Sequence, residues 1–227
     1  MDSVLEIKFT GWTATPRMPF ILSGNAVCLH TPSYSLLLGI IGCCLGRIVN
    51  PHEVKIGFHY SYDSMANDLE TRQRLEFDGR RIKQHSKGTD AYQREFHVLP
   101  RLTIWIDRVD WGGYFNSPVG TPSLGRSQDI LKIDSVKQIE VKSVQETEIS
   151  GCMLPFNSDL HVGGQLVQLA EAYLENEEVG SGRRASKTRI FMSIPHDNNA
   201  KVKMPNLYLT EGENPQGFYL HVFDNEK

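Results

Sequence analysis

Two stretches of alternating apolar and polar residues decide the fold of this chain. Residues 54–62 read VKIGFHYSY, and residues 96–106 read FHVLPRLTIWI. The residues that share one face are Val54, Ile56, Phe58, Tyr60 and Tyr62 in the first stretch, and Phe96, Val98, Leu102, Ile104 and Ile106 in the second. A period of two is typical of half-buried β-strands, so the pattern predicts one strand over each stretch.

The segment between these stretches, residues 63–94, is polar and basic. Ordinary hairpin connections have about two to five residues, and much longer ones are usually functional or disordered. Eight basic and four acidic residues lie between Arg72 and Arg101, a local net charge of +4. We therefore predict a basic arm that protrudes from two strands of one sheet.

A helix is predicted after Thr31, with both of its ends marked. Thr31 is a good N-cap residue, Pro32 suits the first helical position, and Gly46 ends the apolar run. A stripe of small residues runs along this helix through Ser35, Gly39, Gly42 and Gly46. Each interior glycine costs about 1 kcal/mol of helix propensity, so something must approach the stripe closely. A β-sheet is the favoured candidate, and a ligand at the first helical turn stays open.

The remaining pattern predicts an α+β fold. The expected elements are a strand over Val4–Trp12, a strand over Ile133–Thr147, a helix over Gly163–Glu178, a strand over Arg189–Ile194, and a hairpin that joins Leu207–Leu209 to Phe218–Phe223. With the first helix, this order fits helices on one face of an antiparallel sheet. We predict a ferredoxin-like, RRM-related core over residues 1–150, with the arm at about 63–97. Residues 151–227 form a C-terminal extension of a helix, a basic loop and a β-hairpin.

Composition limits the function classes. The chain has 227 residues, of which 40% are hydrophobic and 22% charged, which is ordinary for a globular protein. The longest apolar run, Leu36–Leu45, is too short to span a bilayer, and the N-terminus lacks the pattern of a secretory signal. We expect a cytoplasmic protein without a membrane partner. Four cysteines, at 28, 43, 44 and 152, have no metal-ligand spacing and indicate reduced thiols.

Charge is distributed unevenly along the chain. The formal net charge is -3, yet a second basic island, Arg183, Arg184, Lys187 and Arg189, lies in the loop that starts at Gly180. Two basic islands on an acidic body indicate a localised anionic ligand, and solvated surface charge is the alternative.

Motifs for several enzyme classes are missing from the sequence. It contains no H-E-x-x-H, C-x-x-C or G-x-S-x-G, so we expect no metal and no cofactor. Metal-independent RNA cleavage needs a base, a proton donor and a cation beside the phosphate. His85, with Lys83, Lys87 and Tyr92 nearby in the sequence, supplies such groups, although a histidine in a basic arm also suits a plain phosphate or base contact.

Three segments resemble the CRISPR-associated "Cas five" family. Residues 32–42, PSYSLLLGIIG, resemble its first helix, and residues 122–129, PSLGRSQD, resemble its glycine-arginine segment. Residues 93–106 resemble the strand that returns from its thumb. The order and spacing of the three agree over about residues 4–147, whereas the C-terminal third matches no pattern of the family.

This resemblance implies an RNA-binding subunit of a type I Cascade effector that caps the 5′ handle of the CRISPR RNA (crRNA). Its partners are then the crRNA, the Cascade backbone and large subunits, and target DNA through the complex, in a hetero-oligomer. The implied RNA contacts are Ser33, Tyr34, Ser35, Arg47, Arg72, Arg74, Arg80, Arg81, Lys83, His85, Lys87, Arg94, Arg126 and Ser127. Unpaired bases are expected to stack on Tyr34, Tyr92 or Trp111.

The resemblance leaves three functions open. One branch of the family cleaves precursor RNA with a tyrosine and an adjacent lysine-histidine pair, but Gln84 separates Lys83 from His85 here. We therefore expect a non-catalytic handle binder of a subtype B-like system. A metal-independent endoribonuclease is the alternative, and a subunit that binds only proteins, through its acidic tail and apolar surface, is the third.

Overall fold

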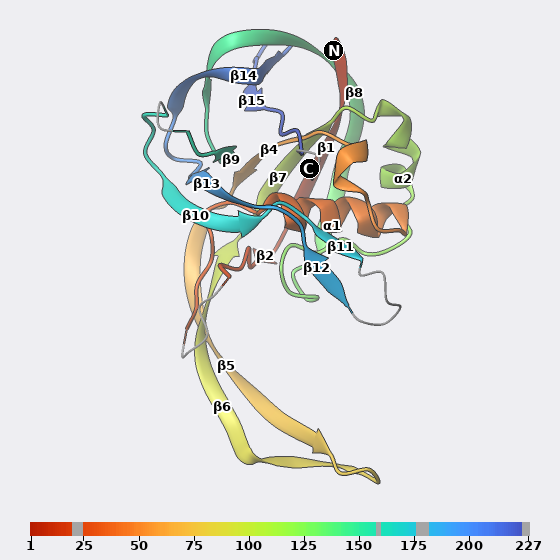
Figure 1. Ribbon diagram of the computed structural model, residues 1–227. Helices are drawn as coiled ribbons and strands as arrows, with labels where there is room; N and C mark the ends of the chain where they lie inside the picture. Colours follow the sequence, from red (N-terminus) through yellow and green to blue (C-terminus); the bar gives the residue numbers. More distant parts are fainter. Residues whose placement is uncertain (20–24, 158–159, 176–181, 224–227) are drawn as a thin grey trace.

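The computed structural model describes residues 1–19, 25–157, 160–175 and 182–223 (Figure 1). The helices are α1 (Tyr34–Leu45) and α2 (Gly112–Asn116), with short 3-10 turns at Pro51–Glu53 and Val109–Trp111. The strands are β1 (Ser3–Gly11), β2 (Thr13–Ala14), β3 (Asn25–Ala26), β4 (Ile56–Ser61), β5 (Ser64–Phe77), β6 (Ile82–Val98), β7 (Arg101–Ile106), β8 (Leu131–Ile149), β9 (Cys152–Pro155), β10 (Gln165–Ala170), β11 (Tyr173–Glu175), β12 (Arg183–Ala185), β13 (Thr188–Ile194), β14 (Ala200–Thr210) and β15 (Gly217–Tyr219). The predicted α+β class is confirmed, in a chain that is richer in strands than in helices.

An antiparallel sheet with the strand order β15-β14-β8-β1-β7-β4 forms the centre of the molecule. β1 lies between β7 and β8, and β4 lies on the far side of β7. Along the chain, α1 separates β1 from β4, and α2 separates β7 from β8. The predicted strands at the start of the chain and at Ile133–Thr147 are confirmed as β1 and β8.

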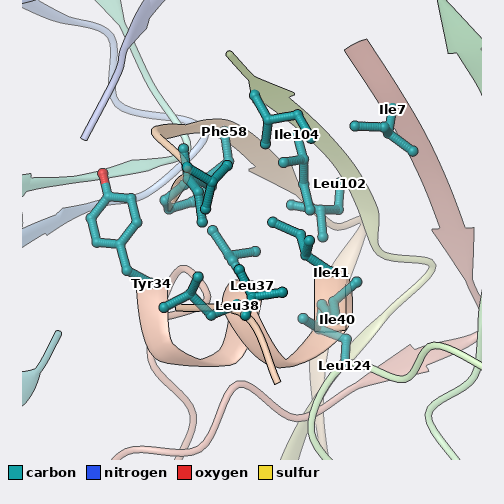
Figure 2. Close-up of a cluster of buried hydrophobic side chains, with 14 of the residues drawn as sticks. Ile7, Tyr34, Leu37, Leu38, Ile40, Ile41, Phe58, Leu102, Ile104 and Leu124 are labelled. Atoms are coloured by element: carbon teal, nitrogen blue, oxygen red, sulfur yellow. The ribbon is translucent and has the colours of Figure 1, made fainter. Parts of the chain in front are cut away.

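The main core lies between α1 and one face of this sheet (Figure 2). Leu37, Ile40 and Ile41 of the helix pack with Phe58 of β4 and Ile104 of β7. Every one of these side chains is almost fully buried. Burial of a side chain of this kind contributes about 1.5–3 kcal/mol, so the apolar face of α1 fixes the helix on the sheet.

The last two strands of this order, β14 and β15, bring Phe218 over the face of the sheet that is opposite to α1. β14 pairs with the second half of β8, and β15 follows β14, as the alternation near Leu207 and Phe218 predicted. Trp105 of β7 points away from α1 and stacks on Phe218, with ring centroids 4.4 Å apart. A Cβ atom on Gly57 of β4 would lie 2.7 Å from Phe218, so only glycine permits this approach.

β5 and β6 form a long antiparallel hairpin that leaves the sheet from β4 and returns to it at β7 (Figure 1). Ser64 pairs with Val98 at its root and Phe77 with Ile82 near its tip. The register shifts between Gln73 and Leu75, and the distal part of the hairpin turns aside in Figure 1. Such irregularities bend a ribbon.

The prediction of one strand over residues 96–106 is wrong. β6 ends at Val98, and β7 begins at Arg101. Leu99 between them has a φ of 50°, in the left-handed region that a leucine rarely adopts, and Pro100 follows. The alternation therefore belongs to two strands in different sheets, with a tight turn between them.

The helix α1 starts later than predicted. Its N-cap is Ser33, whose side chain accepts a hydrogen bond from the Leu36 N–H, whereas Thr31 is buried and bonds Ser193. Gly46 ends the helix with a φ of 70°, as predicted.

The expectation that a sheet packs on the glycine stripe of α1 is wrong. Gly39 has open space around it, and a Cβ on Gly42 would lie 2.7 Å from the carbonyl oxygen of Arg47. The large side chains of the helix contact the sheet instead.

The predicted helix over residues 163–178 is also wrong, and its last three residues lie outside the described part of the chain. β10 and β11 occupy this segment, and β10 belongs to a small sheet with the order β10-β13-β9. Val167 and Leu169 point inward while Leu166 and Gln168 are exposed, which is the period of a strand. Glu171 follows β10, is buried, and pairs with Arg189 and His221.

The cysteines are buried or partly buried thiols. All four cysteines are free, and burial raises the pKa of Cys28, Cys44 and Cys152 to about 12, which keeps them protonated. Among the described residues, no helix is long and apolar enough to cross a membrane.

Candidate functional site

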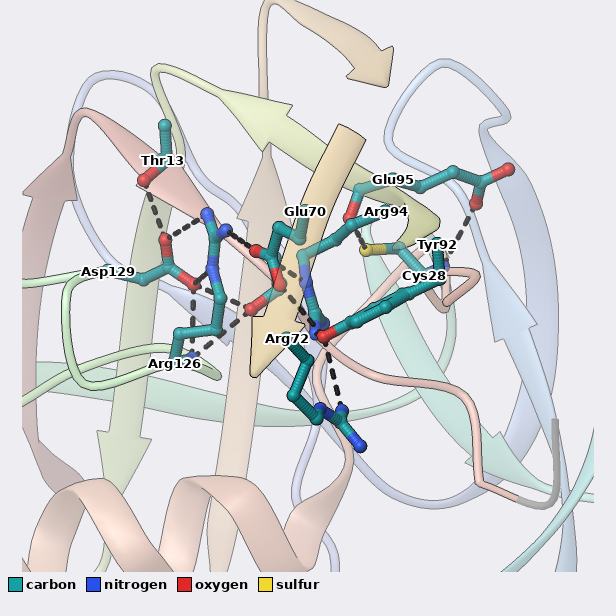
Figure 3. A network of polar contacts seen from close by, with 10 residues as sticks. Thr13, Cys28, Glu70, Arg72, Tyr92, Arg94, Glu95, Arg126 and Asp129 are labelled. Carbon is teal, nitrogen blue, oxygen red and sulfur yellow. Dashed lines mark hydrogen bonds and ion pairs between the residues drawn. The ribbon is translucent and has the colours of Figure 1, made fainter. Parts of the chain in front are cut away.

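Four charged side chains meet beside the half of the hairpin that is nearer the sheet (Figure 3). The Oε1 atom of Glu70, on β5, lies 2.8 Å from the Nε of Arg94 and 2.6 Å from the Nη1 of Arg126. Arg126, in the loop before β8, also donates to both oxygens of Asp129 at 3.0 and 3.1 Å. The hairpin and the glycine-arginine segment, which are distant in the sequence, are thus joined by Glu70.

Asp129 is the buried anchor of this network and has no exposed surface. The hydroxyls of Thr13 and Thr15 each donate to it at 2.6 Å. Burial alone would raise the pKa of Asp129, but the hydrogen bonds from Arg126, Thr13 and Thr15 outweigh burial and hold the pKa below its ordinary value. The carboxylate therefore stays charged and orients the guanidinium of Arg126.

Tyr92 lies between two arginines on the same face of the hairpin. Its hydroxyl donates to Glu70 at 2.8 Å, and Arg72 and Arg94 both donate to that hydroxyl. The guanidinium carbons of Arg72 and Arg94 lie 5.1 and 5.0 Å from the ring centroid. These cation–π contacts hold the ring and both arginines in place (Figure 3).

A pocket of about 520 Å³ opens beside this network. Its wall includes Ser33 and Ser35 at the start of α1, together with Arg17, Arg94 and Arg126. Tyr173 of β11 and Thr188 of β13 close it from the C-terminal part. The structure thus brings together four of the residues expected to contact RNA, from three separate segments.

Arg17 is the pocket residue that sequence reasoning missed. It is exposed, and within the described ranges it has no ion-pair partner. Glu70 and Asp129, by contrast, balance the charges of Arg94 and Arg126. A single arginine between Pro16 and Met18 carries no pattern, so only the fold reveals its position.

Two of the predicted contact residues and one predicted stacking residue lie elsewhere. Tyr34 is 2% exposed, donates its hydroxyl to the Met153 carbonyl and stacks on His221, so its ring offers no face to a base. Arg47 lies beyond the other end of α1, where it pairs with Glu53. Trp111 is buried beneath Arg47 and Arg108.

The remaining predicted residues lie along the distal hairpin or beside the pocket. Arg74 pairs with Asp90, and Lys83 and His85 face Glu76 at 3.3 and 3.9 Å. The backbone N–H groups of Arg80 and Arg81 bind Asp78 in the terminal turn. Lys87 is exposed, and Ser127 lies in the turn between Arg126 and Asp129.

The groups proposed for RNA cleavage are not close together. Lys83 pairs across the hairpin with Glu76, whereas Tyr92 pairs with Glu70. Along β5, these two cross-strand pairs are six residues apart, roughly 20 Å at the usual rise per residue of a strand. Among the described residues, no cluster of three or more His, Cys, Asp or Glu side chains could hold a metal ion.

The four residues of the second basic island lie in or beside β12 and β13. Arg183 of β12 lines a cavity of about 430 Å³ along α1 with Gly39, Gly42 and Tyr173, so the glycine stripe faces this cavity. Gly180 and Ser181 of the predicted loop lie outside the described residues.

Comparison with solved structures identifies the fold. A chain of a "CRISPR RNA-guided surveillance complex" has a TM-score of 0.59 and 14% identity, over 88% of this chain and 91% of that chain. A "CRISPR protein from Archaeoglobus fulgidus" has a TM-score of 0.54 and 9% identity, over 97% and 100%. A chain of the "Type III-B Cmr-beta" complex "bound to cognate target RNA and AMPPnP" has a TM-score of 0.51 and 10% identity, over 88% and 86%. No family profile and no curated protein matches the sequence. The chain therefore has a fold that CRISPR-associated proteins adopt.

Proposed function

We propose that the chain is a Cas five-type subunit of a CRISPR effector, and that it binds the 5′ handle of the crRNA without cleaving it. The pocket at the start of α1 is the observation that carries this proposal. The sequence analysis selected Ser33, Ser35, Arg94 and Arg126 as RNA contacts, and these four residues line one cavity in the fold. The fold similarity to chains of CRISPR complexes supports the same assignment.

The chemistry of the pocket suits a phosphodiester strand. The first N–H groups of a helix attract anions, and Ser33 and Ser35 add hydroxyls at that point. Arg126 uses three of its five N–H donors on Glu70 and Asp129, which leaves donors for a ligand. Arg17, in the pocket wall, supplies positive charge that these carboxylates do not balance, and Arg72 lies next to the network on the ring of Tyr92. Tyr92 adds an aromatic ring beside them.

The topology supports the wider assignment. The order β1-α1-β4-β7-α2-β8, with β1 between β7 and β8, is that expected of a ferredoxin-like core. The long β5–β6 hairpin between β4 and β7 supports its assignment as the thumb of the family. Under this proposal the partners are the crRNA, the backbone and large subunits, and target DNA through the complex. The protein then acts in the cytoplasm, where the crRNA is.

A gel-shift experiment in EDTA tests binding and cleavage together. Purified chain is mixed with a labelled repeat-derived RNA, and both mobility and product length are read on one gel. We expect a shift with intact RNA, because the cleavage groups lie apart along the hairpin. Shortened RNA that is lost in His85→Ala would establish the nuclease instead, and an unshifted RNA would contradict handle binding.

Arg126 is a poor test residue even though it lines the pocket. Its removal leaves the buried Asp129 without its cation, so a loss of RNA binding could reflect misfolding. Arg17 avoids this problem because it is exposed and pairs with no described carboxylate. Arg101→Ala is the matched control, since Arg101 is also exposed but lies on β7 and pairs with Asp63.

A further inference from the structure

An exposed apolar patch lies at the root of the hairpin, formed by Trp12, Leu99 and Ile130. Trp12 is 82% exposed, the largest exposed fraction of any large apolar side chain in the described ranges. Ile130 is 52% and Leu99 37% exposed. Scattered apolar residues on a surface are ordinary, but a tryptophan beside two aliphatic residues marks an interaction site.

The backbone beneath the patch joins three segments of the chain around Gly11. The Leu99 N–H donates to the Trp12 carbonyl at 2.9 Å, and the Gly11 N–H donates to the Pro100 carbonyl at 3.1 Å. A Cβ on Gly11 would lie 3.0 Å from the Ile130 carbonyl oxygen. These contacts hold the backbone of Trp12 and the left-handed Leu99 in place, so the backbone beneath the patch is fixed before any partner binds.

The charges around the patch indicate what covers it. Thr10 of β1 pairs with Arg101 on one side and Lys132 on the other. Asp63 binds Arg101 at 2.8 Å, and Asp134 binds Lys132 at 2.8 Å, so the rim is neutral. Among the described residues, no guanidinium lies over the Trp12 ring, unlike the rings of Tyr92 and Trp111. A neutral polar rim around an apolar centre suits a protein surface better than a polyanion.

We propose that Trp12 anchors a protein–protein interface and enters an apolar pocket of a neighbouring protein subunit, with Leu99 and Ile130 packed around it. Tryptophan is enriched among the residues that dominate such interfaces, and a polar rim excludes water from them. This inference rests on the proposed place of the chain in a CRISPR complex and goes beyond RNA binding, because Trp12 is not part of the wall of the pocket at the start of α1. The next residue, Thr13, bonds Asp129, so the docked partner sits beside the RNA contact.

Hydroxyl-radical footprinting read by mass spectrometry tests this inference residue by residue. Three samples are compared: the free chain, the chain with repeat-derived RNA, and the complex purified from its host through a tag on this chain. We expect Trp12 and Ile130 to be modified equally in the first two samples and to be protected several-fold in the third. Protection by RNA alone would overturn the inference in favour of base stacking. Protection of the free chain that grows with its concentration would assign the patch to a second copy, and unchanged modification in the complex would show a free surface.

Substitution of Trp12 supplies the energetic test. Trp12→Ala is expected to weaken binding of the chain to the remaining subunits by roughly 30-fold, the equivalent of a 2 kcal/mol hot spot. Val119→Ala, at a side chain that is 71% exposed, is the matched control and should leave this affinity unchanged. Equal affinities of the two variants would overturn the inference. The affinity of Trp12→Ala for RNA is measured separately, so failure here is distinct from failure of the proposed function.

Discussion

Asp129 accepts hydrogen bonds from two threonines and an arginine and has no exposed surface. Asp129→Ala should lower the free energy of unfolding by about 3 kcal/mol, because it leaves Arg126 and two hydroxyls without their acceptor. Asp129→Asn keeps an acceptor and should cost less. Urea denaturation measures both changes, and a loss below about 1 kcal/mol for Asp129→Ala would show that the network does not depend on this carboxylate.

A substitution of Tyr34 tests whether this residue has a structural role or the base-stacking role that the resemblance implied. Tyr34→Phe removes one buried hydrogen bond to the Met153 carbonyl and should cost about 1 kcal/mol of stability. The affinity for repeat-derived RNA should not change, since the ring is enclosed by His221, Phe191 and Phe58. A clear loss of RNA affinity in a variant that folds normally would show that Tyr34 contacts the RNA.

The loop that carries Arg126 depends on one glycine. Gly125 has a φ of 113°, and a Cβ there would lie 2.2 Å from the Thr15 carbonyl oxygen. Gly125→Ala therefore meets both backbone strain and a collision, and thermal unfolding should show a loss above 2 kcal/mol. Gly79→Ala is the matched control, because its φ is 90° but nothing lies within 4 Å. The account predicts a much larger loss of stability at Gly125. Equal losses would mean that the loop can shift to accommodate the Cβ atom.

The elements show why sequence reasoning succeeded in some places and failed in others. β1 and α1 were predictable because their own apolar pattern meets one large surface. Residues 163–175 were not, because Leu166, Leu169 and Tyr173 have helical spacing, yet the contacts of Val167 and Leu169 with the core fix a strand. Tertiary packing overrides local propensity in such segments.

The candidate site was only partly predictable for the same reason. The resemblance found Ser33, Ser35, Arg94 and Arg126, which line the pocket, but it also selected Arg47, which lies beyond the far end of α1. Arg17, Glu70 and Asp129 complete the site through contacts across the fold that no local pattern records.

At the scale of the whole molecule, stability should fall in two steps as the pH is lowered. Burial lowers the pKa of His97 from 6.5 to about 3, with a smaller effect of His30 and His196. Below pH 6.5, His97 therefore binds a proton in the unfolded chain but stays neutral in the native chain. The free energy of unfolding then falls by about 1.4 kcal/mol per pH unit below that value. His97→Asn, which keeps an acceptor for Tyr60, should flatten this first step in chemical denaturation across pH 4.5–7.5. An unchanged slope would contradict it.

The second step comes from the carboxylates of the arginine network. Hydrogen bonds from Arg94, Tyr92 and Arg126 outweigh burial at Glu70, so its pKa, like that of Asp129, lies below the ordinary value. Their stabilisation is complete above about pH 4.5 and is lost as the pH falls through the lowered values. Asp129→Asn should reduce this second loss, and a profile that matches the wild type below pH 4.5 would count against the network.

The salt dependence of RNA binding tests the central claim most directly. The affinity for repeat-derived RNA is measured from low to moderate salt for the wild type, Arg17→Ala and Arg101→Ala. If a phosphate lies in the arginine pocket, Arg17→Ala weakens binding and flattens the log-log slope by roughly 0.7, while Arg101→Ala leaves the slope unchanged. If Arg17→Ala matches the control in both affinity and slope, the pocket does not hold the RNA and the proposed function is wrong.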